Sequence, residues 1–174
     1  MKILDIVAHP HLGQSVVNKA WMERLAREPA VTVHDLYGAY PNQVIDVARE
    51  QKLLLAHDRI VFQFPMYWYS SPALLKEWQD VVLTHGWAYG SRGTQLRGKE
   101  FMLAISIGGS GDNYQAGASN QFSVSELVKP FQAMANLTGM RFLPAFQKTG
   151  VNVFPSKDVR ESADELAAYL KADF

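Results

Sequence analysis

The chain has 174 residues, of which 48% are hydrophobic and 20% charged, so we expect one globular domain with a substantial core over residues 1–174. The formal net charge is zero, and no basic surface predicts nucleic acid or an anionic membrane as a partner. The absence of cysteine excludes disulfides, thiolate metal sites and cysteine nucleophiles. Without a signal-peptide pattern or a long apolar run, we expect a cytoplasmic protein.

Apolar strand segments alternate with amphipathic helix segments along the whole chain. We expect strands at 3–7, 31–36, 60–64, 101–107 and within 140–151, and helices at 15–27, 46–57, 73–84, 123–137 and 156–172. Ser15 is expected to cap the first helix, and Leu54 and Leu55 to face the core from the second. Pro130 either kinks the fourth helix or marks the first turn of its second half.

This alternation predicts an α/β fold: a three-layer, doubly wound, five-stranded parallel sheet. At this length the flavodoxin-like strand order 2-1-3-4-5 is expected, with a ligand crevice at the carboxyl ends of strands 1, 3 and 4. The loops after those strands, residues 8–14, 65–71 and 108–122, are therefore the expected site.

The first of these loops leads into a helix N-terminus, where free N–H groups and the helix dipole favour an anion. Ser15, Val16, Val17 and Asn18 are candidate phosphate ligands, and His9 can hydrogen-bond the same group. The alternative is an ordinary capped turn. His9 and His11 have no evident third ligand, so we expect no metal.

The second loop carries three consecutive aromatic residues, Tyr67, Trp68 and Tyr69, after Met66. Flat side chains and free backbone N–H groups at a strand end suit a flat ligand with polar edges. The alternative is that these aromatics only pack under the next helix.

The third loop begins with Ser106, Ile107, Gly108 and Gly109 at the end of a buried strand. Adjacent glycines let the backbone approach a planar ligand closely. Tyr114 could place a phenol near the same ring edge, although a single tyrosine is more often packed or on the surface. Together the loops predict sites for a phosphate, a flat ring and a ring edge, as in a flavin.

Motifs in these loops and beside them also resemble a known family. They are Ala-His-Pro at 8–10 with Ser15 and Asn18, Val-His-Asp-Leu-Tyr at 33–37, Tyr-Pro at 40–41, Phe-Gln-Phe-Pro-Met-Tyr-Trp-Tyr at 62–69, Pro-Ala-Leu-Leu-Lys-Glu-Trp at 72–78, His-Gly-Trp-Ala-Tyr at 85–89 and Gly-Gly-Ser-Gly-Asp-Asn-Tyr at 108–114. The chain resembles the NAD(P)H:quinone oxidoreductase (DT-diaphorase-like) flavoproteins. Within that family it is most similar to the bacterial branch that includes ancillary proteins of Kef potassium-efflux systems.

The resemblance implies FMN, with FAD as the alternative, and two-electron transfer from NAD(P)H through the flavin to a quinone. It also implies a homodimer with the flavin at the subunit interface. By position, His9 and residues 15–18 would hold the flavin phosphate, residues 66–69 and 106–109 its ring, and Tyr114 would be the catalytic residue. Because nicotinamide and quinone need the same flavin face, we expect ping-pong kinetics.

Two positions depart from the family pattern. A histidine common in the family falls at Ser119 here, or at Asn120 if the loop shifts by one residue, and neither side chain can become a cation. Asp5 interrupts an apolar strand, and we expect it to be paired or to lie at a sheet end. The competing function is a regulatory flavoprotein that binds and activates a Kef-type potassium-efflux transporter. That partner would hold it at the membrane.

Overall fold

A computed structural model covers residues 1–174 and contains one parallel sheet with helices on both faces. The strands are β1 (Ile3–Val7), β2 (Val31–Asp35), β3 (Arg59–Pro65), β4 (Glu100–Ile107), β5 (Arg141–Phe142) and β6 (Phe146–Thr149). The helices are α1 (Val17–Leu25), α2 (Leu36–Ala39), α3 (Val47–Leu55), α4 (Ala73–Val82), α5 (Val124–Leu127), α6 (Lys129–Thr138) and α7 (Ser156–Tyr169).

The strand order is β2-β1-β3-β4-β5, and β6 also pairs with β4, so the predicted flavodoxin-like order is confirmed. The predicted fifth strand is broken. β5 pairs with the start of β4 at Glu100 and Phe101, and β6 pairs with its end from Ala104 to Ile107. Because β6 runs to the carboxyl end of β4, the segment that follows it also reaches the predicted ligand edge.

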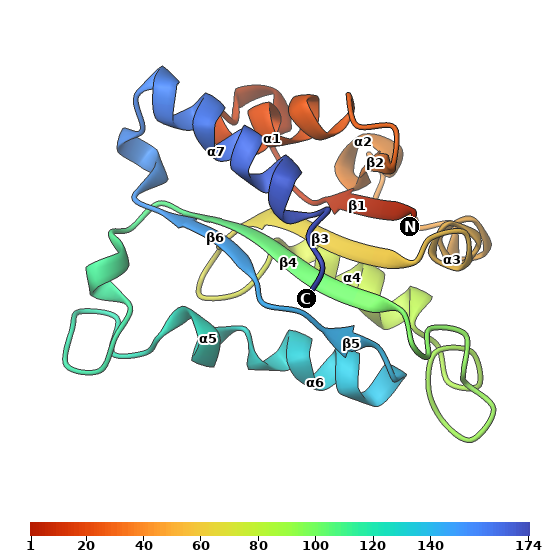
Figure 1. Cartoon of the computed structure of the whole chain (residues 1–174). Helices are drawn as coiled ribbons and strands as arrows, with labels where there is room; N and C mark the ends of the chain where they lie inside the picture. Colours follow the sequence, from red (N-terminus) through yellow and green to blue (C-terminus); the bar gives the residue numbers. More distant parts are fainter.

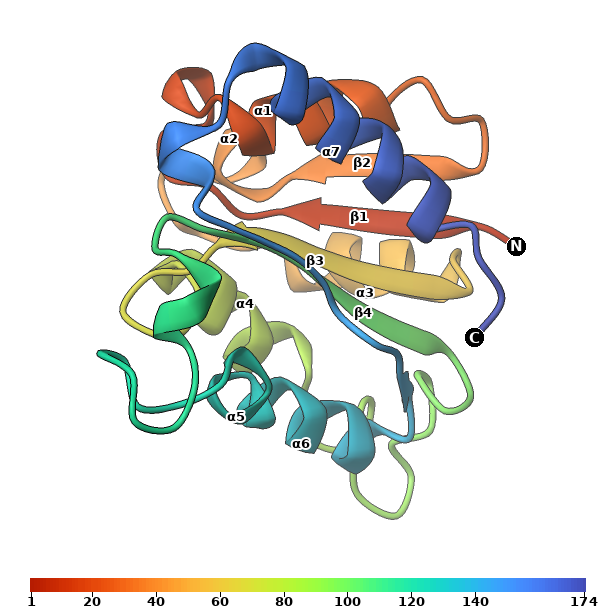
Figure 2. The same cartoon turned by 60° about the vertical axis from the view of Figure 1, so that its left-hand side comes forward.

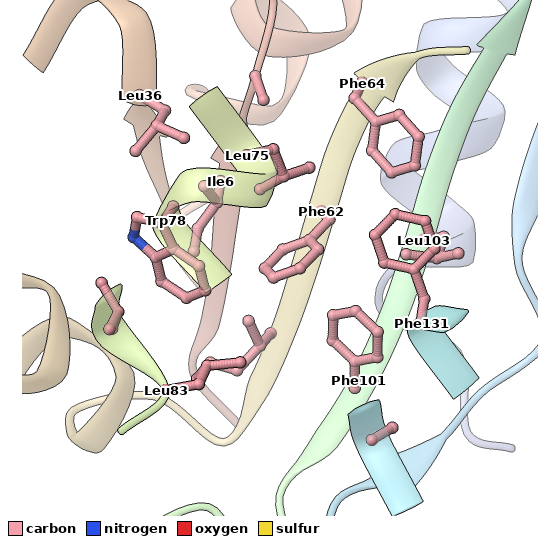
Figure 3. Close-up of a cluster of buried hydrophobic side chains, with 14 of the residues drawn as sticks. Ile6, Leu36, Phe62, Phe64, Leu75, Trp78, Leu83, Phe101, Leu103 and Phe131 are labelled. Carbon is pink, nitrogen blue, oxygen red and sulfur yellow. The ribbon is translucent and has the colours of Figure 1, made fainter. Parts of the chain in front are cut away.

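The sheet is buried on both faces, which is why its strands are nearly continuous apolar runs. Helices α1 and α7 lie together over one face, and α3, α4 and α6 lie on the other (Figures 1 and 2). On the α4/α6 face, Phe62 makes edge-to-face pairs with Trp78, Phe101 and Phe131 (Figure 3). The alternate strand positions, such as Val61 and Met102, pack beneath α1 and α7.

The helix ends agree with the sequence only in part. Helix α1 is assigned from Val17, with Val16 as the N-cap in helical conformation, two residues later than predicted. Ser15 still acts as a cap, because its Oγ accepts the Asn18 N–H at 3.2 Å. Pro130 stands in the first turn of α6, separate from α5, which is the second of the two predicted alternatives.

Two side chains are placed differently from the prediction. Leu55 is 47% exposed, because it ends α3 about 100° around the helix from the buried Leu54. Asp5 is fully buried in the middle of β1, beside Val33 and Val61, and neither carboxylate oxygen has a hydrogen-bond partner. The expectation that Asp5 is paired or at a sheet end is wrong. Burial raises the pKa of Asp5 to about 8.

Candidate functional site

A cavity of about 570 Å³ opens at the carboxyl ends of β1, β3 and β4, where the sequence predicts a ligand. Its lining contains His9, His11, Gln14, Ser15, Val16, Val17, Asn18, Pro65, Met66, Tyr67, Ser106, Gly108, Val151 and Asn152. Nine of the predicted site residues are therefore brought together: His9, Ser15, Val16, Val17, Asn18, Met66, Tyr67, Ser106 and Gly108. Residues from all three predicted loops therefore line one cavity.

The N-terminus of α1 forms one end of the cavity. Residues 15–18 all line the cavity at this end, and the N–H groups of Val16 and Val17 precede the first helical hydrogen bonds. Ser15 orients this turn by capping Asn18. Free N–H groups at the positive end of the helix dipole can bind a phosphate.

His9 lies beside this helix end with one ring nitrogen already in use. Its Nδ1 accepts the His11 N–H at 3.0 Å, so in the neutral ring Nε2 carries the proton and is a donor. Burial lowers the pKa of His9, the nearby His11 lowers it further, and Asp35 opposes both effects. At neutral pH His9 therefore offers the site a neutral N–H donor.

The floor of the cavity is a buried polar network. Asn18 Nδ2 donates to Ser106 Oγ at 2.7 Å, and both side chains are almost fully buried while lining the cavity. Beneath them Gln63 is fully buried, and its Nε2 donates to the Asn18 backbone oxygen at 2.9 Å. Gln63 Oε1 has no hydrogen-bond partner. Unpaired buried polar atoms are uncommon in folded proteins and are costly.

The aromatic residues after β3 form a tight turn. Tyr67 and Ser70 exchange two backbone hydrogen bonds of 3.0 Å, and the central residues Trp68 and Tyr69 have φ values of +47° and +62°. Positive φ at both positions is the pattern of a type I′ turn, which strongly favours Asn and Gly. Trp68 is 92% exposed and Tyr69 46% exposed. They do not pack under the next helix, so that alternative is excluded.

The glycine loop makes close contacts with its neighbours. A Cβ atom on Gly108 would lie 2.5 Å from Asn152 Nδ2, so any larger residue would have to displace this amide from beside the cavity. Gly109 faces the ring of Tyr114, whose hydroxyl would lie 3.5 Å from an added Cβ. Burial raises the pKa of Tyr114, and the nearby Tyr69 adds to this effect, so Tyr114 is a neutral phenol at neutral pH.

Five predicted residues do not line the cavity. Ile107 is buried in the core, and Trp68, Tyr69, Gly109 and Tyr114 belong to the two loops described above, which contribute Tyr67 and Gly108 to the lining. The Tyr69 hydroxyl donates to Asn120 Oδ1 at 3.2 Å and links those loops. Sequence reasoning missed Asn152 because the fifth strand was not counted among those ending at the site. The rule that parallel strands share a carboxyl edge would have included it.

This sheet order, with a helix N-terminus, an aromatic turn and a glycine backbone around one cavity, defines a doubly wound α/β protein with a site for a ligand that combines an anion and a flat ring. A family model described as "Flavodoxin-like fold" matches residues 1–172. The chain belongs to this family.

Known proteins from several bacteria are similar over nearly the whole chain. A Bacillus subtilis protein named uncharacterized NAD(P)H oxidoreductase YrkL is 62% identical over 173 residues, 99% of each chain. The potassium-efflux ancillary protein KefG of Cronobacter sakazakii is 40% identical over 171 residues, 98% of this chain and 89% of that one. No helix of the structure has both the length and the apolar character needed to cross a membrane.

Solved structures agree with the fold. General stress protein 14 of Treponema denticola, in complex with FMN, has a TM-score of 0.94 at 42% identity and covers 98% of each chain. An NADPH-quinone reductase of P. pentosaceus has a TM-score of 0.91 at 37% identity over the full length of both chains. A protein from Streptomycin violaceusniger named a thermophilic tryptophan halogenase has a TM-score of 0.96 at 48% identity, over 98% of this chain and 99% of that one.

Proposed function

We propose that this chain is an FMN-dependent NAD(P)H oxidoreductase that reduces a quinone or a similar flat acceptor. The observation that carries the proposal is the single cavity that joins the N-terminus of α1 to the aromatic turn and to the backbone at Gly108. These groups match a phosphate, a flat ring and the polar edge of that ring. The names NAD(P)H oxidoreductase and NADPH-quinone reductase among the relatives support the same chemistry.

The residues present fit a flavin mononucleotide. Ser15, Val16, Val17 and Asn18 would hold the phosphate, together with the His9 Nε2–H donor. Met66, Tyr67, Ser106 and Gly108 would hold the ring, and the absence of a side chain at 108 leaves its backbone accessible there. The FMN complex of the Treponema protein supports FMN over FAD, which stays the alternative.

Bound FMN would supply two-electron transfer between NAD(P)H and the acceptor. The protein's own residues supply binding, orientation and hydrogen-bond donors. Tyr114 keeps its proton at neutral pH and can donate to an atom on which negative charge grows. Ser119 is exposed and cannot become a cation, so Tyr114 and backbone N–H groups would act without a charged partner.

We infer that nicotinamide and the acceptor occupy the same place in turn. Both are flat rings that must stack against the ring site beside Met66 and Tyr67, and reaction requires contacts of roughly 3–3.5 Å. Steady-state rates measured over NAD(P)H concentration at several fixed quinone concentrations should give parallel double-reciprocal lines. Intersecting lines would mean that both substrates bind together, and the shared-site mechanism would be wrong.

We also infer a homodimer. Tyr67, Trp68, Tyr69 and Phe122 are 39%, 92%, 46% and 54% exposed in two loops linked beside the cavity mouth. An apolar patch of this kind is more often covered by a partner than left in water. A second copy of the chain would cover it and enclose the ligand ring. Sedimentation that shows only a 19.5 kDa monomer at micromolar concentration would contradict this inference.

The proposed function is tested by purifying the protein and recording its visible absorption. A flavin spectrum is expected, and the released cofactor should have the mass of FMN. Under anaerobic conditions about one NAD(P)H should be oxidised per flavin without quinone, and continuous turnover should require a quinone as acceptor. Ser15→Asp places a negative charge against the phosphate site and should greatly reduce flavin retention. Ser91→Asp adds the same charge at an exposed position outside the cavity and is the control. Equal flavin retention in both variants would mean that the phosphate does not bind at the Ser15 end of the cavity.

The alternative is a regulatory subunit of a Kef-type potassium-efflux transporter. It is supported by the 40% identity to KefG, which is lower than the 62% identity to the oxidoreductase YrkL. Co-purification with such a transporter, and a change in its potassium flux, would support it.

A further inference from the structure

The donors and acceptors in the floor of the cavity have one consistent orientation, and it starts from a backbone oxygen. The Asn18 carbonyl oxygen can only accept a hydrogen bond, and Gln63 lies 2.9 Å from it. The Gln63 nitrogen must therefore face this oxygen. Which end of a side-chain amide carries the oxygen is normally inferred from its hydrogen-bond partners. For Gln63 that partner is a backbone carbonyl oxygen, which can only accept, so the orientation of the amide is determined.

The same nitrogen sets the orientation of the next side chain. Gln63 Nε2 lies 3.4 Å from Asn18 Oδ1, so the oxygen of the Asn18 amide faces Gln63. The Asn18 nitrogen then points the other way and donates to Ser106 Oγ at 2.7 Å. The Ser106 oxygen accepts this hydrogen bond, and no protein acceptor takes the hydroxyl proton of Ser106. That proton is free to point into the cavity that Ser106 lines.

We propose that Gln63 is a positioning residue that, through Asn18, makes the Ser106 hydroxyl a hydrogen-bond donor to the ligand in this cavity. Gln63 does not line the cavity and acts only through its contacts with Asn18. The matching ligand group is an acceptor oxygen or nitrogen. The proposal rests on the proposed function in one respect: the acceptor would be an atom of FMN.

A double-mutant cycle with FMN as the probe tests this relay. Gln63→Leu and Ser106→Ala should each weaken FMN binding about tenfold, the loss expected for one oriented hydrogen bond. The double variant should bind about as weakly as Ser106→Ala alone, because Gln63 acts through that hydroxyl. Dissociation constants are measured from the quenching of FMN fluorescence. Losses that multiply to about a hundredfold, or normal binding by Gln63→Leu, would overturn the proposal.

Gln51→Leu is a matched control for a general loss of stability. Gln51 also donates its side-chain amide to a backbone oxygen, that of Val82 at 2.9 Å, but it lies outside the cavity. This variant should bind FMN as the wild type does.

Gln63→Glu gives a second readout that a purely structural role would not produce. When protonated, the introduced carboxyl group can still donate to the Asn18 oxygen, whereas its ionised form presents only acceptors to that oxygen. FMN affinity of this variant should therefore recover as the pH is lowered, and that of Gln63→Leu should not. Identical pH profiles for the two variants would overturn the proposal.

A measurement without ligand separates this inference from the proposed function. In ¹⁵N-labelled protein, the side-chain amide protons of Asn18 should exchange slowly in the wild type and in Gln51→Leu, and much faster in Gln63→Leu. Wild-type protein that binds no FMN would overturn the proposed function while this exchange still tests the relay. Slow exchange that persists in Gln63→Leu would overturn the relay itself.

Discussion

The sheet has an amino edge, where its parallel strands begin, and a carboxyl edge, where they end. These two edges are built in opposite ways. At the amino edge, Arg59 is 1% exposed, and its side-chain nitrogens are paired. Its Nη2 lies 2.6 Å from Glu100, and its Nη1 donates to the Leu170 and Ala172 oxygens at 2.5 and 3.0 Å. Glu100 is also paired with Arg141, which binds the backbone oxygen of Phe174. Charged groups from distant parts of the chain satisfy one another there.

At the carboxyl edge, strain and unpaired polar atoms collect instead. Trp68, Tyr69 and Gln121 have positive φ, Gln63 Oε1 has no partner, and Trp68 is almost fully exposed. Strained backbone and unsatisfied polar groups tend to occur where function requires them. We therefore infer that the amino edge stabilises the fold, whereas the carboxyl edge is arranged for a ligand. Four variants test this division.

The largest effect is expected at Asp5, which lies between the two edges and has no partner that explains its burial. Its pKa is raised from 3.8 to about 8, so the folded state binds more protons between these values. Stability should be greatest near pH 4 and should fall by about 1.4 kcal/mol per unit as the pH rises toward 8. Asp5→Val should remove this loss, so the variant gains most at pH 8.

The measurement for Asp5 is urea unfolding at several pH values. Asp164→Asn changes an exposed carboxylate and should leave the slope as it is in the wild type. If Asp5→Val kept the wild-type slope, the carboxyl group of Asp5 would not be the source of the pH dependence.

Removing Arg59 should damage stability without affecting the ligand edge. Arg59→Leu leaves two backbone oxygens and part of Glu100 unpaired, and should cost about 3–5 kcal/mol of unfolding free energy. FMN affinity of the protein that remains folded should not change. Lys76→Ala breaks an exposed pair with Asp80 and should cost less than about 1 kcal/mol. A loss of FMN affinity in Arg59→Leu would show that the amino edge also affects ligand binding, contrary to the inferred division.

Relieving the backbone strain in the aromatic turn should make the protein more stable but less active. Trp68→Asn combined with Tyr69→Gly supplies residues suited to positive φ, and should add about 2–3 kcal/mol of stability while slowing quinone reduction. Thermal unfolding and steady-state rates measure the two effects. Gln43→Gly relieves a positive φ of +58° outside the cavity and should stabilise without changing the rate. A fully active double variant would show that the aromatic side chains are not needed.

The smallest effect is expected from Tyr114→Phe, which keeps the ring and removes its hydroxyl. If the hydroxyl donates to growing negative charge, its loss should cost about 1.5–3 kcal/mol in the transition state, or about tenfold to a hundredfold in rate. FMN binding should change little, because Tyr114 does not line the cavity. Rapid-mixing rates of NAD(P)H oxidation check this, and full activity would remove Tyr114 from the reaction.

The sequence by itself determined the strand order and the loops that form the site. Apolar runs such as 3–7 and 101–107 are long enough for strands buried on both faces, and the capping residues Ser15 and Asp46 stand near the starts of their helices. Parallel strands of this order bring the loops after β1, β3 and β4 to one edge without further information. Nine of the predicted site residues meet in one cavity for that reason.

Only the tertiary structure decided the details that involve contacts between distant segments. Trp-Tyr carries no local signal for positive φ, so the turn depends on the Tyr67–Ser70 pairing and on contacts with the loop at Asn120. Asn152 reaches the cavity because β6 pairs with the end of β4, and a break within residues 142–146 cannot be seen from composition. The Gln63–Asn18–Ser106 network joins three segments up to 88 residues apart, and hydrogen bonds over such separations are set by packing rather than by local sequence.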